Sequence, residues 1–400
     1  MLGRDVYIVD AVRTPIGKIG GGLADVRPDD LAAHVVGAIV DRAQTKSGRF
    51  DGAQVDEVVF GAANQAGEDN RNVGRMAALL AGLPTTVTGS TVNRLCASGL
   101  DATMQAARAI AVGEASIMIA GGSESMTRAP WVLPKPSRRY PVGNEQLYST
   151  TLGWRMVNPE MPGAWTVSLG ESTEILAEKY AIGREASDAF AARSHDLAAR
   201  AWKDGTFNDE IVQVPGSELS RDETIRDGVT AESLAGLKPV FRKDGIVTAG
   251  NASSLNDGAA ALLLVDGDTA ERLGLEPLAR VRSTGAHGVD PDVFGIGPVQ
   301  AVRTALERAG ETLDGVDVLE LNEAFAAQSL ACVGQWKDLD PDKVNPHGGA
   351  IAIGHPLGCS GARLAGSLAW QLKRRGGGLG VAALCIGVGQ GLAMVLEGVA

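Results

Sequence analysis

The sequence predicts an α/β protein that contains two copies of one strand–helix unit. In the first and last thirds of the 400 residues, short apolar runs alternate with helical patterns, which favours a mainly parallel, doubly wound sheet. The 52 glycines and the aromatic content of 4% favour tight strand–turn–helix packing over an all-β sandwich. Residues 95–99 (LCASG) and 357–361 (LGCSG) share Leu and Ser-Gly in register, and an internal duplication is the economical account of that match.

The first copy is expected to contain three strands, over residues 6–9, 58–60 and 117–120. Asp29 and Asp30 are expected to cap a helix between the first two strands, because aspartate accepts hydrogen bonds from the free N–H groups of a helix start. A second helix is predicted over residues 98–112, where apolar side chains recur on one face and Gly113 provides a stop.

The second copy repeats this plan. A strand near residues 279–281 is followed by a helix around Val302, and residues 316–320 repeat the pattern of residues 55–59. The Ser-Gly pair of each copy is expected to open a helix, the second of which ends at Gly376. A pseudo-twofold relation between the copies then brings both helix N-termini, and both glycine-rich strand ends, to one central place.

The middle of the chain differs from both copies. Four prolines between residues 130 and 141 interrupt regular structure, and helical patterns follow at residues 171–181 and 185–203. We expect an inserted layer that covers the site and binds the non-reacting part of the substrate. The expected division is an N-terminal half over residues 1–126, completed by about 255–278, an insertion over 127–254, and a C-terminal half over 279–400.

The composition excludes several classes of protein. The formal net charge of −11 argues against a general nucleic-acid binder, which usually carries a basic face. Four cysteines in a chain of this size do not indicate a disulfide framework. The N-terminus has the pattern of a strand rather than a signal peptide, and no apolar run approaches the roughly 18 residues of a membrane span. These observations favour a soluble cytoplasmic protein.

Two cysteines and one histidine stand in surroundings typical of reactive groups. They are Cys96 in residues 92–99 (VNRLCASG), His355 in residues 354–358 (GHPLG) and Cys385 in residues 384–391 (LCIGVGQG). A thiol-based acyl-transfer enzyme needs a nucleophile, a base and a second group that moves a proton on carbon. The helix start after Cys96 is expected to stabilise its thiolate and to lower its pKa.

The other two segments supply complementary chemistry. A tight Gly-His-Pro turn fixes the imidazole of His355, which favours a general base. The alternating glycines after Cys385 leave N–H groups for an oxyanion, although such a strand end also suits a packing contact or a phosphate loop. Asn322, after a strand, can orient a water, donate to an oxyanion or cap a helix. A metal site at His355, Cys359 and Cys385 lacks the paired Cys-x-x-Cys spacing of such sites.

The chain resembles the thiolases, or acetyl-CoA C-acyltransferases. The resemblance runs from Val6 to the C-terminus and rests on four motifs, residues 93–99 (NRLCASG), 322–325 (NEAF), 348–356 (GGAIAIGHP) and 385–389 (CIGVG). It implies two similar α/β halves in a five-layered α-β-α-β-α fold, with an inserted loop domain. It also implies an acyltransferase that needs no metal or other cofactor, takes CoA and acyl-CoA as substrates, and assembles as a homodimer or homotetramer.

The resemblance further implies a role for each catalytic residue. Cys96 is expected to be the acylated nucleophile, His355 to activate it, and Cys385 to protonate or deprotonate the α-carbon of the acyl-CoA. His355, with a water held by Asn322, is expected to form one oxyanion hole, and the backbone N–H groups of Cys96 and Gly387 to form the other.

Substrate contacts follow from the same resemblance. Residues 247–253 (VTAGNAS) resemble the pantetheine-contacting stretch of the family, with Ser253 as the contact. Arg226 stands where the family places an arginine near the CoA nucleotide. The reaction implied is acyl transfer between a 3-oxoacyl-CoA and CoA through a thioester on Cys96, which releases or condenses acetyl-CoA.

Two further segments resemble those of 3-oxoadipyl-CoA thiolases of aromatic-compound degradation, residues 61–73 (GAANQAGEDNRNV) and 151–155 (TLGWR). Asn64, Arg71 and Arg155 would then serve the free carboxylate of a dicarboxylate substrate, unless they are solvated loop residues. A general 3-oxoacyl-CoA or acetoacetyl-CoA thiolase, as in fatty acid degradation, is the alternative within the family.

Three other hypotheses stay open from the sequence. A decarboxylating condensing enzyme shares the duplicated fold but uses a histidine in place of the second thiol. A non-catalytic CoA-binding subunit needs none of the three reactive groups. A reversible disulfide between Cys96 and Cys385 is a regulatory hypothesis, because both thiols are expected in one pocket.

Overall fold

The computed structural model describes residues 3–64 and 67–399, and its centre is a large mixed β-sheet. Its strands are β1 (Val6–Arg13), β2 (Gly17–Lys18), β3 (Glu57–Gly61), β4 (Thr88–Val92), β5 (Ile117–Ser125), β8 (Asn256–Asp266), β9 (Ala279–Gly288), β10 (Val318–Leu321), β11 (Gly378–Ile386) and β12 (Gln390–Gly398). Their order across the sheet is β10-β11-β12-β9-β1-β8-β5-β3-β4, and β2 pairs with β8.

The order of the strands confirms the duplication. The series β3-β5-β8-β1 contains one parallel pairing followed by two antiparallel pairings. The series β10-β11-β12-β9 has the same three pairings in the same order. The two series meet where β1 pairs with β9 through Tyr7 and Arg280 and through Ile8 and Ala279.

The expectation of a mainly parallel sheet is wrong. Strands β11 and β12 are joined by the short turn between Ile386 and Gln390, and a connection of that length permits only antiparallel pairing. In the first copy β8 takes the equivalent antiparallel place beside β5, although it follows the whole insertion in sequence. Each copy therefore has a parallel outer part and an antiparallel inner part.

Helices divide into a middle layer and two outer layers. The middle helices are α3 (Ser98–Val112) and α11 (Leu357–Arg375), and the outer helices beside the sheet are α1 (Pro28–Lys46), α2 (Val73–Leu80), α7 (Gly267–Leu273) and α8 (Gly297–Ala309). Two short helices, α9 (Ala326–Val333) and α10 (Ala350–Ile353), pack mainly against helices of the insertion. Helix α3 packs against α11 at small residues: a Cβ on Gly99 would lie 2.6 Å from the carbonyl oxygen of Gly358. Close contact between the two helix starts therefore depends on these glycines.

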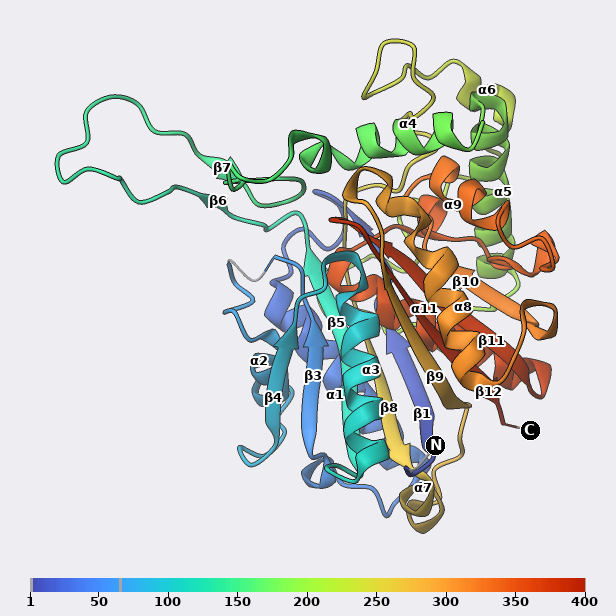
Figure 1. Ribbon diagram of the computed structural model, residues 1–400. Helices are drawn as coiled ribbons and strands as arrows, with labels where there is room; N and C mark the ends of the chain where they lie inside the picture. The colour runs from blue at the N-terminus through green and yellow to red at the C-terminus, as the bar shows by residue number, and fades with distance from the viewer. Residues whose placement is uncertain (1–2, 65–66, 400) are drawn as a thin grey trace.

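Three buried apolar clusters correspond to these layers. One joins α3 and α11 to the inner faces of both halves of the sheet and includes Leu100 and Leu368. A second lies between α1 and the first half and includes Val35, and a third lies between α8 and the second half and includes Val302. The five layers α-β-α-β-α expected from the resemblance are confirmed by this arrangement (Figure 1).

Two helix starts differ from the expectation. Arg27 holds the N-cap position of α1 and Pro28 follows it, so Asp29 and Asp30 lie in the first turn, and capping by the aspartates is wrong. Asp29 instead accepts two hydrogen bonds from the guanidinium of Arg27. Helix α11 begins at Leu357, three residues before Ser360, so only the first Ser-Gly pair opens an α-helix as expected.

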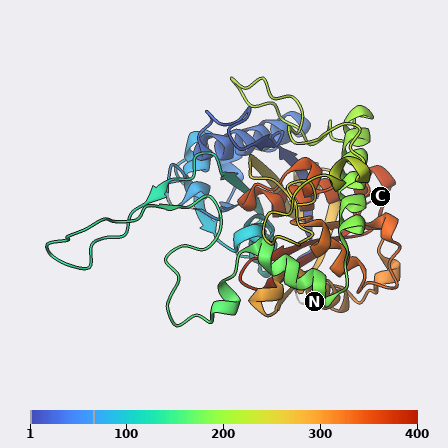
Figure 2. The same cartoon turned by 90° about the horizontal axis from the view of Figure 1, so that it is seen from above.

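The insertion contains an arm and a helical group. The arm carries the two-stranded pair β6 (Trp131–Val132) and β7 (Tyr148–Ser149) and projects far from the body (Figures 1 and 2). Helices α4 (Leu169–Lys179), α5 (Arg184–Lys203) and α6 (Ala231–Ala235) lie at one end of the sheet.

Domain boundaries at residues 126, 254 and 278 stay a prediction. No helix in the described residues is long and apolar enough to span a membrane.

Candidate active site

Cys96 lies in a single 3-10 turn, η2 (Leu95–Ala97), between β4 and α3. Three hydrogen bonds hold this turn: the N–H of Leu95 donates to Asn93 Oδ1 at 3.0 Å, the N–H of Arg94 donates to Ser98 Oγ at 2.9 Å, and Ser98 Oγ donates to the Leu95 carbonyl at 2.6 Å. The turn packs against both β11 and α11, so the second copy of the unit surrounds the cysteine of the first.

Burial dominates the acidity of the Cys96 thiol. The side chain is only 5% exposed, and the loss of hydration raises its pKa to about 11. Hydrogen bonds from the N–H of Gly387 and from its own N–H act in the opposite direction. The low pKa expected from the helix start is therefore wrong, because burial outweighs the N–H groups and the helix dipole.

His355 is held on three sides at the start of α11. Its N–H donates to Asn256 Oδ1 at 2.9 Å, its Nδ1 lies 2.6 Å from Ser360 Oγ, and its Nε2 lies 3.3 Å from Asn322 Nδ2. Burial, with a smaller contribution from the charge of Arg363, lowers the pKa of His355 to about 3. The imidazole is therefore neutral at physiological pH, as a general base requires.

Asn322 presents an unused acceptor to the site. Its N–H donates to the Ala383 carbonyl at 2.9 Å, which fixes it at the end of β10. Its Oδ1 is buried and has no hydrogen-bond partner among the described residues. Leaving such an atom unpaired costs about 1–3 kcal/mol, so the position suits a water or a substrate group. The alternative role as a helix cap is wrong, because Phe325 holds the N-cap position of α9.

Cys385 ends β11 beside Cys96. It is fully buried and packs with Phe294 and Ala324. Burial raises its pKa well above the usual value, and the charge of Cys96 is the next largest cause, which requires the two sulfurs to be near each other. The described chain includes all four cysteines, and each is a free, buried thiol.

The glycine turn after Cys385 needs left-handed backbone. Val388 has φ of 69° and Gly389 has φ of 81°, and a Cβ on Gly389 would lie 2.2 Å from the Val289 carbonyl oxygen. The N–H of Gly387, at the start of this turn, is directed at the Cys96 sulfur. The structure thus places Cys96 beside Gly387 and Cys385, and places His355 beside Asn322, whose N–H bonds to β11 two residues before Cys385.

Ser253 and Arg226 lie farther out. The Oγ and the N–H of Ser253 both donate to the Ala324 carbonyl, at 3.1 and 3.0 Å, so Ser253 adjoins the segment that follows Asn322. Arg226 is exposed on the insertion and contacts His195 of α5, with Nη2 to Nε2 at 3.0 Å. The substrate contacts assigned to both residues stay predictions.

Helix α4 of the insertion contacts the site. The Cδ2 atom of Leu169 lies 3.4 Å from the position that a Cβ on Gly387 would occupy, and Leu169 also packs on the cluster that contains Cys385.

No group of three or more His, Cys, Asp or Glu side chains that could hold a metal ion occurs within residues 3–64 and 67–399.

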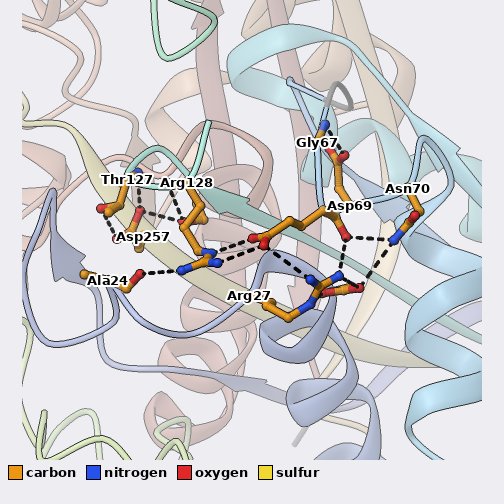
Figure 3. Close-up of polar contacts among 11 residues, drawn as sticks. Ala24, Arg27, Gly67, Asp69, Asn70, Thr127, Arg128 and Asp257 are labelled. Atoms are coloured by element: carbon orange, nitrogen blue, oxygen red, sulfur yellow. Dashed lines mark hydrogen bonds and ion pairs between the residues drawn. The ribbon is translucent and has the colours of Figure 1, made fainter. Parts of the chain in front are cut away.

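Residues 67–72, which form a loop before α2, are anchored by charge (Figure 3). Arg27 and Arg128 both bind the carboxylate of Glu68, and Arg128 also donates to the Ala24 carbonyl. These bonds hold Glu68 ionised, since Arg128 lowers its pKa. The loop is thereby fastened to the start of α1 and to the base of the arm.

Of the residues expected to recognise a dicarboxylate, Asn64 adjoins this anchor, since it lines a small pocket together with Glu68 and Arg128. Asn64 Nδ2 donates to Thr150 Oγ1 at 2.9 Å, and Arg71 is exposed in left-handed backbone with φ of 64°. Gln65 and Ala66, which belong to the same sequence segment, lie outside the described residues. A carboxylate-binding role for Asn64, Arg71 and Arg155 stays a prediction.

The sequence reasoning missed three residues that position the site. Asn256 and Ser360 hold His355, and Glu124 Oε2 accepts hydrogen bonds from the N–H groups of Ala63 and Gly358 at 2.8 and 2.9 Å. Burial raises the pKa of Glu124 to about 7. Each is a polar residue within or beside a long buried segment, and that pattern could have identified them.

Comparison with known proteins agrees with this arrangement. Residues 6–268 match the family model "Thiolase, N-terminal domain", and residues 275–398 match "Thiolase, C-terminal domain". The beta-ketoadipyl-CoA thiolase of Pseudomonas knackmussii is 51% identical over 99% of this chain and 100% of its own length. The 3-oxoadipyl-CoA/3-oxo-5,6-dehydrosuberyl-CoA thiolase of Escherichia coli K12 is 49% identical over 98% of this chain and 99% of its own length.

Solved structures agree as well. The crystal structure of the Bacillus anthracis acetyl-CoA acetyltransferase matches with a TM-score of 0.90 at 43% identity and covers 100% of both chains. That of human mitochondrial 3-ketoacyl-CoA thiolase in complex with CoA matches with a TM-score of 0.91 at 37% identity and covers 99% of this chain and 98% of that one. The chain is therefore an acyltransferase and belongs to the thiolase family.

Proposed function

We propose that the chain cleaves 3-oxoadipyl-CoA with CoA, through a thioester on Cys96. The observation that carries this substrate is the identity of about half of all residues, over nearly the whole chain, with relatives named for beta-ketoadipyl-CoA or 3-oxoadipyl-CoA. A general 3-oxoacyl-CoA thiolase is the alternative, because the acetyl-CoA acetyltransferase of Chromobacterium violaceum is 45% identical over 98% of this chain.

In the first half-reaction, Cys96 Sγ attacks the C3 carbonyl and its proton passes to His355 Nε2. The raised pKa of Cys96, about 11, and the lowered pKa of His355, about 3, support a resting pair in which both groups are neutral. The proton then moves as the sulfur–carbon bond forms. The N–H groups of Cys96 and Gly387 stabilise the oxyanion on C3, at about 3–4 kcal/mol for a good donor.

Cleavage of the C2–C3 bond releases acetyl-CoA as its enolate. In this proposal Cys385 protonates C2, while His355 and a water held by Asn322 stabilise the enolate oxygen. The buried, unpaired Oδ1 of Asn322 supports the water site. The pKa of Cys385, raised by burial, supports a protonated thiol that is ready to donate.

In the second half-reaction, the thiol of free CoA passes its proton to the Cys385 thiolate and attacks the acyl group on Cys96, whose sulfur leaves and takes the proton back from His355. This regenerates the enzyme and gives ping-pong kinetics. Ser253 is proposed to contact pantetheine, and Arg226 the CoA nucleotide. CoA and acyl-CoA serve as substrates, and neither a metal nor another cofactor enters this scheme.

A homodimer or homotetramer and a cytoplasmic location belong to the same proposal. The apolar side chains exposed along the arm, among them Trp131, Tyr140 and Val142, support contact with a second copy of the chain. Sedimentation of the intact chain, and of the chain with Trp131→Ser and Val142→Ser together, tests this part. A monomeric intact chain would contradict it.

The substrate test compares CoA-dependent cleavage of 3-oxoadipyl-CoA, acetoacetyl-CoA and a medium-chain 3-oxoacyl-CoA by wild type and Cys96→Ala. The proposal requires the highest kcat/KM for 3-oxoadipyl-CoA and loss of cleavage in the variant. A higher kcat/KM for either other substrate would reject the subtype. Full activity without the Cys96 thiol would reject the mechanism.

A further inference from the structure

We propose that Ser360 is a positioning residue that holds the proton of His355 on Nδ1 and thereby makes Nε2 the basic nitrogen. The inference rests on the proposed role of His355 as the base. It adds a residue whose hydroxyl decides which of the two imidazole nitrogens can accept the Cys96 proton, since a neutral imidazole offers only one lone pair.

The contacts of Ser360 favour one of two arrangements of protons. A hydroxyl has one proton, and Ser360 Oγ lies 2.9 Å from the Pro356 carbonyl oxygen, which can only accept. With its proton on that carbonyl, Oγ accepts from the other neighbour at 2.6 Å, His355 Nδ1. Nδ1 therefore carries the imidazole proton.

The opposite edge of the ring favours the same tautomer. With the amide of Asn322 placed as in the structure, Nδ2 lies 3.3 Å from His355 Nε2, and this contact is a hydrogen bond when Nε2 offers a lone pair. The backbone N–H of His355 is bound separately by Asn256 Oδ1 at 2.9 Å, which fixes the turn without involving the ring. Two contacts on opposite edges of the imidazole thus agree.

The first copy of the unit shows what is specific about Ser360. Its counterpart in register, Ser98, accepts from the backbone N–H of Arg94 at 2.9 Å and donates to a carbonyl of the preceding turn. The register aligns Arg94 with Pro356, and proline has no N–H. In the second copy, Ser360 Oγ therefore has no backbone N–H of this kind to accept from, and it accepts from the imidazole of His355 instead.

The consequence is kinetic. Without the hydroxyl, the buried Nδ1–H of His355 loses its acceptor, and the tautomer that carries the proton on Nε2 gains population. That tautomer cannot accept the thiol proton of Cys96. Loss of the partner that orients a metal-bound histidine typically costs about 10–100-fold, and by analogy we expect Ser360→Ala to lower kcat by about 10–100-fold with little change in KM.

A matched control exists on the same helix. Ser367 is 5% exposed, and its Oγ has no hydrogen-bond partner in the part of the chain that the structure describes. Ser367→Ala removes a buried hydroxyl from α11 without touching His355. It should keep wild-type kcat, whereas Ser360→Ala should not.

The deciding readout is the tautomer itself. Imidazole ¹⁵N shifts of ¹⁵N-histidine-labelled wild type, Ser360→Ala and Ser367→Ala report which ring nitrogen carries the proton, and His355→Ala assigns the signals among five histidines. The proposal predicts Nδ1–H in wild type and Ser367→Ala, and a shift toward Nε2–H in Ser360→Ala. A folded Ser360→Ala protein with wild-type shifts and kcat would overturn it.

Failure of the role of Ser360 and failure of the proposed function give different results. Inactive His355→Ala beside fully active Ser360→Ala would reject the role of Ser360 and leave the base in place. Fully active His355→Ala would reject the proposed function itself. Restoration of part of kcat by Ser360→Cys, which returns a weak acceptor of similar size, would support the positioning role.

Discussion

Cys96 and His355 occupy corresponding turns of the two copies, and the turns differ in what surrounds the reactive group. In the first copy, Asn93 aligns with His355, and its amide accepts from the Leu95 N–H and donates to the Ala63 carbonyl. In the second copy, Gly358 aligns with Cys96, and its N–H binds Glu124. Two corresponding turns therefore carry the nucleophile in the first copy and the base in the second.

The comparison teaches that each copy completes the site of the other. The turn of Cys96 packs on β11 and α11 of the second copy, and the N–H of Gly387 reaches its sulfur. The start of α11 is in turn held by Glu124 of the first copy. Neither half contains a working set of groups alone.

The largest expected effect comes from removing the reactive group of the first turn. Cys96→Ala should lower kcat by about 10⁴-fold or more, because no other thiol is placed to form the thioester. Steady-state thiolysis measures it. Cys332→Ala is the control: Cys332 lies in α9, its thiol donates to the Gly295 carbonyl, and the variant should keep activity. Comparable losses in both variants would contradict the assignment.

The next prediction tests why the second turn cannot carry a side chain at the position of Cys96. A Cβ on Gly358 would lie 2.5 Å from the Ser123 carbonyl oxygen and 2.7 Å from that of Gly61. Gly358→Ala should therefore lower the free energy of unfolding by about 1–3 kcal/mol. Chemical denaturation measures this, with Gly163→Ala as the control, because nothing among the described residues lies within 4 Å of a Cβ there. Equal stabilities would refute the steric account.

A third prediction concerns the protonation states of Cys96 and His355. With the pKa of Cys96 raised to about 11, its alkylation rate should keep rising as pH increases toward about 11, whereas an ordinary thiol levels off near 9. The pKa of His355, lowered to about 3, adds no step near pH 6.5. Iodoacetamide labelling of Cys96, followed by mass spectrometry across pH 5–11, measures both. A plateau below pH 8 would contradict this, because it would mean that Cys96 is already a thiolate, paired with a protonated His355, before substrate binds.

The pKa of His355 also affects stability. Between about pH 3 and 6.5 the unfolded chain binds a proton at this histidine that the folded chain does not, so this contribution to stability falls as pH falls through that window. Urea denaturation of wild type and His355→Gln at pH 5 and pH 7 isolates it. The variant should lose less stability than wild type on acidification, and an equal loss would contradict the lowered pKa.

The smallest expected effect is the difference between Ser98 and Ser360. Ser98→Ala and Ser360→Ala each remove one hydroxyl with two hydrogen bonds, and each should cost about 1 kcal/mol of stability. Only Ser360 touches an imidazole, so Ser98→Ala should lower kcat less than Ser360→Ala. Equal kcat for the two variants would mean that the serines serve the fold alone.

Much of this arrangement could be predicted from the sequence because it depends on local patterns. The match of residues 95–99 with 357–361 predicts the duplication, and the surroundings of Cys96, His355 and Cys385 predict the site. Strand direction could not be predicted, because β8 returns beside β5 only after the whole insertion and local periodicity carries no information on pairing.

Other features depend on burial, which the sequence does not reveal. Cys96 is only 5% exposed, and this burial raises the pKa of its thiol. The helix start after Cys96 is present as expected, but its lowering effect on the pKa is smaller than the effect of burial. The roles of Asn256 and Glu124 arise from contacts between distant segments. The prolines of the insertion predict irregular structure, but not that the arm projects from the body (Figure 2).

The most direct test of the central claim is to trap the acyl-enzyme. Wild type and His355→Ala are mixed with 3-oxoadipyl-CoA in the absence of CoA, quenched in acid and digested for peptide mass spectrometry. Cleavage of the C2–C3 bond leaves a succinyl group on the nucleophile, so the account predicts succinyl on Cys96 in wild type and far less in His355→Ala. Succinyl on another cysteine, or none while acetyl-CoA is released, would contradict it.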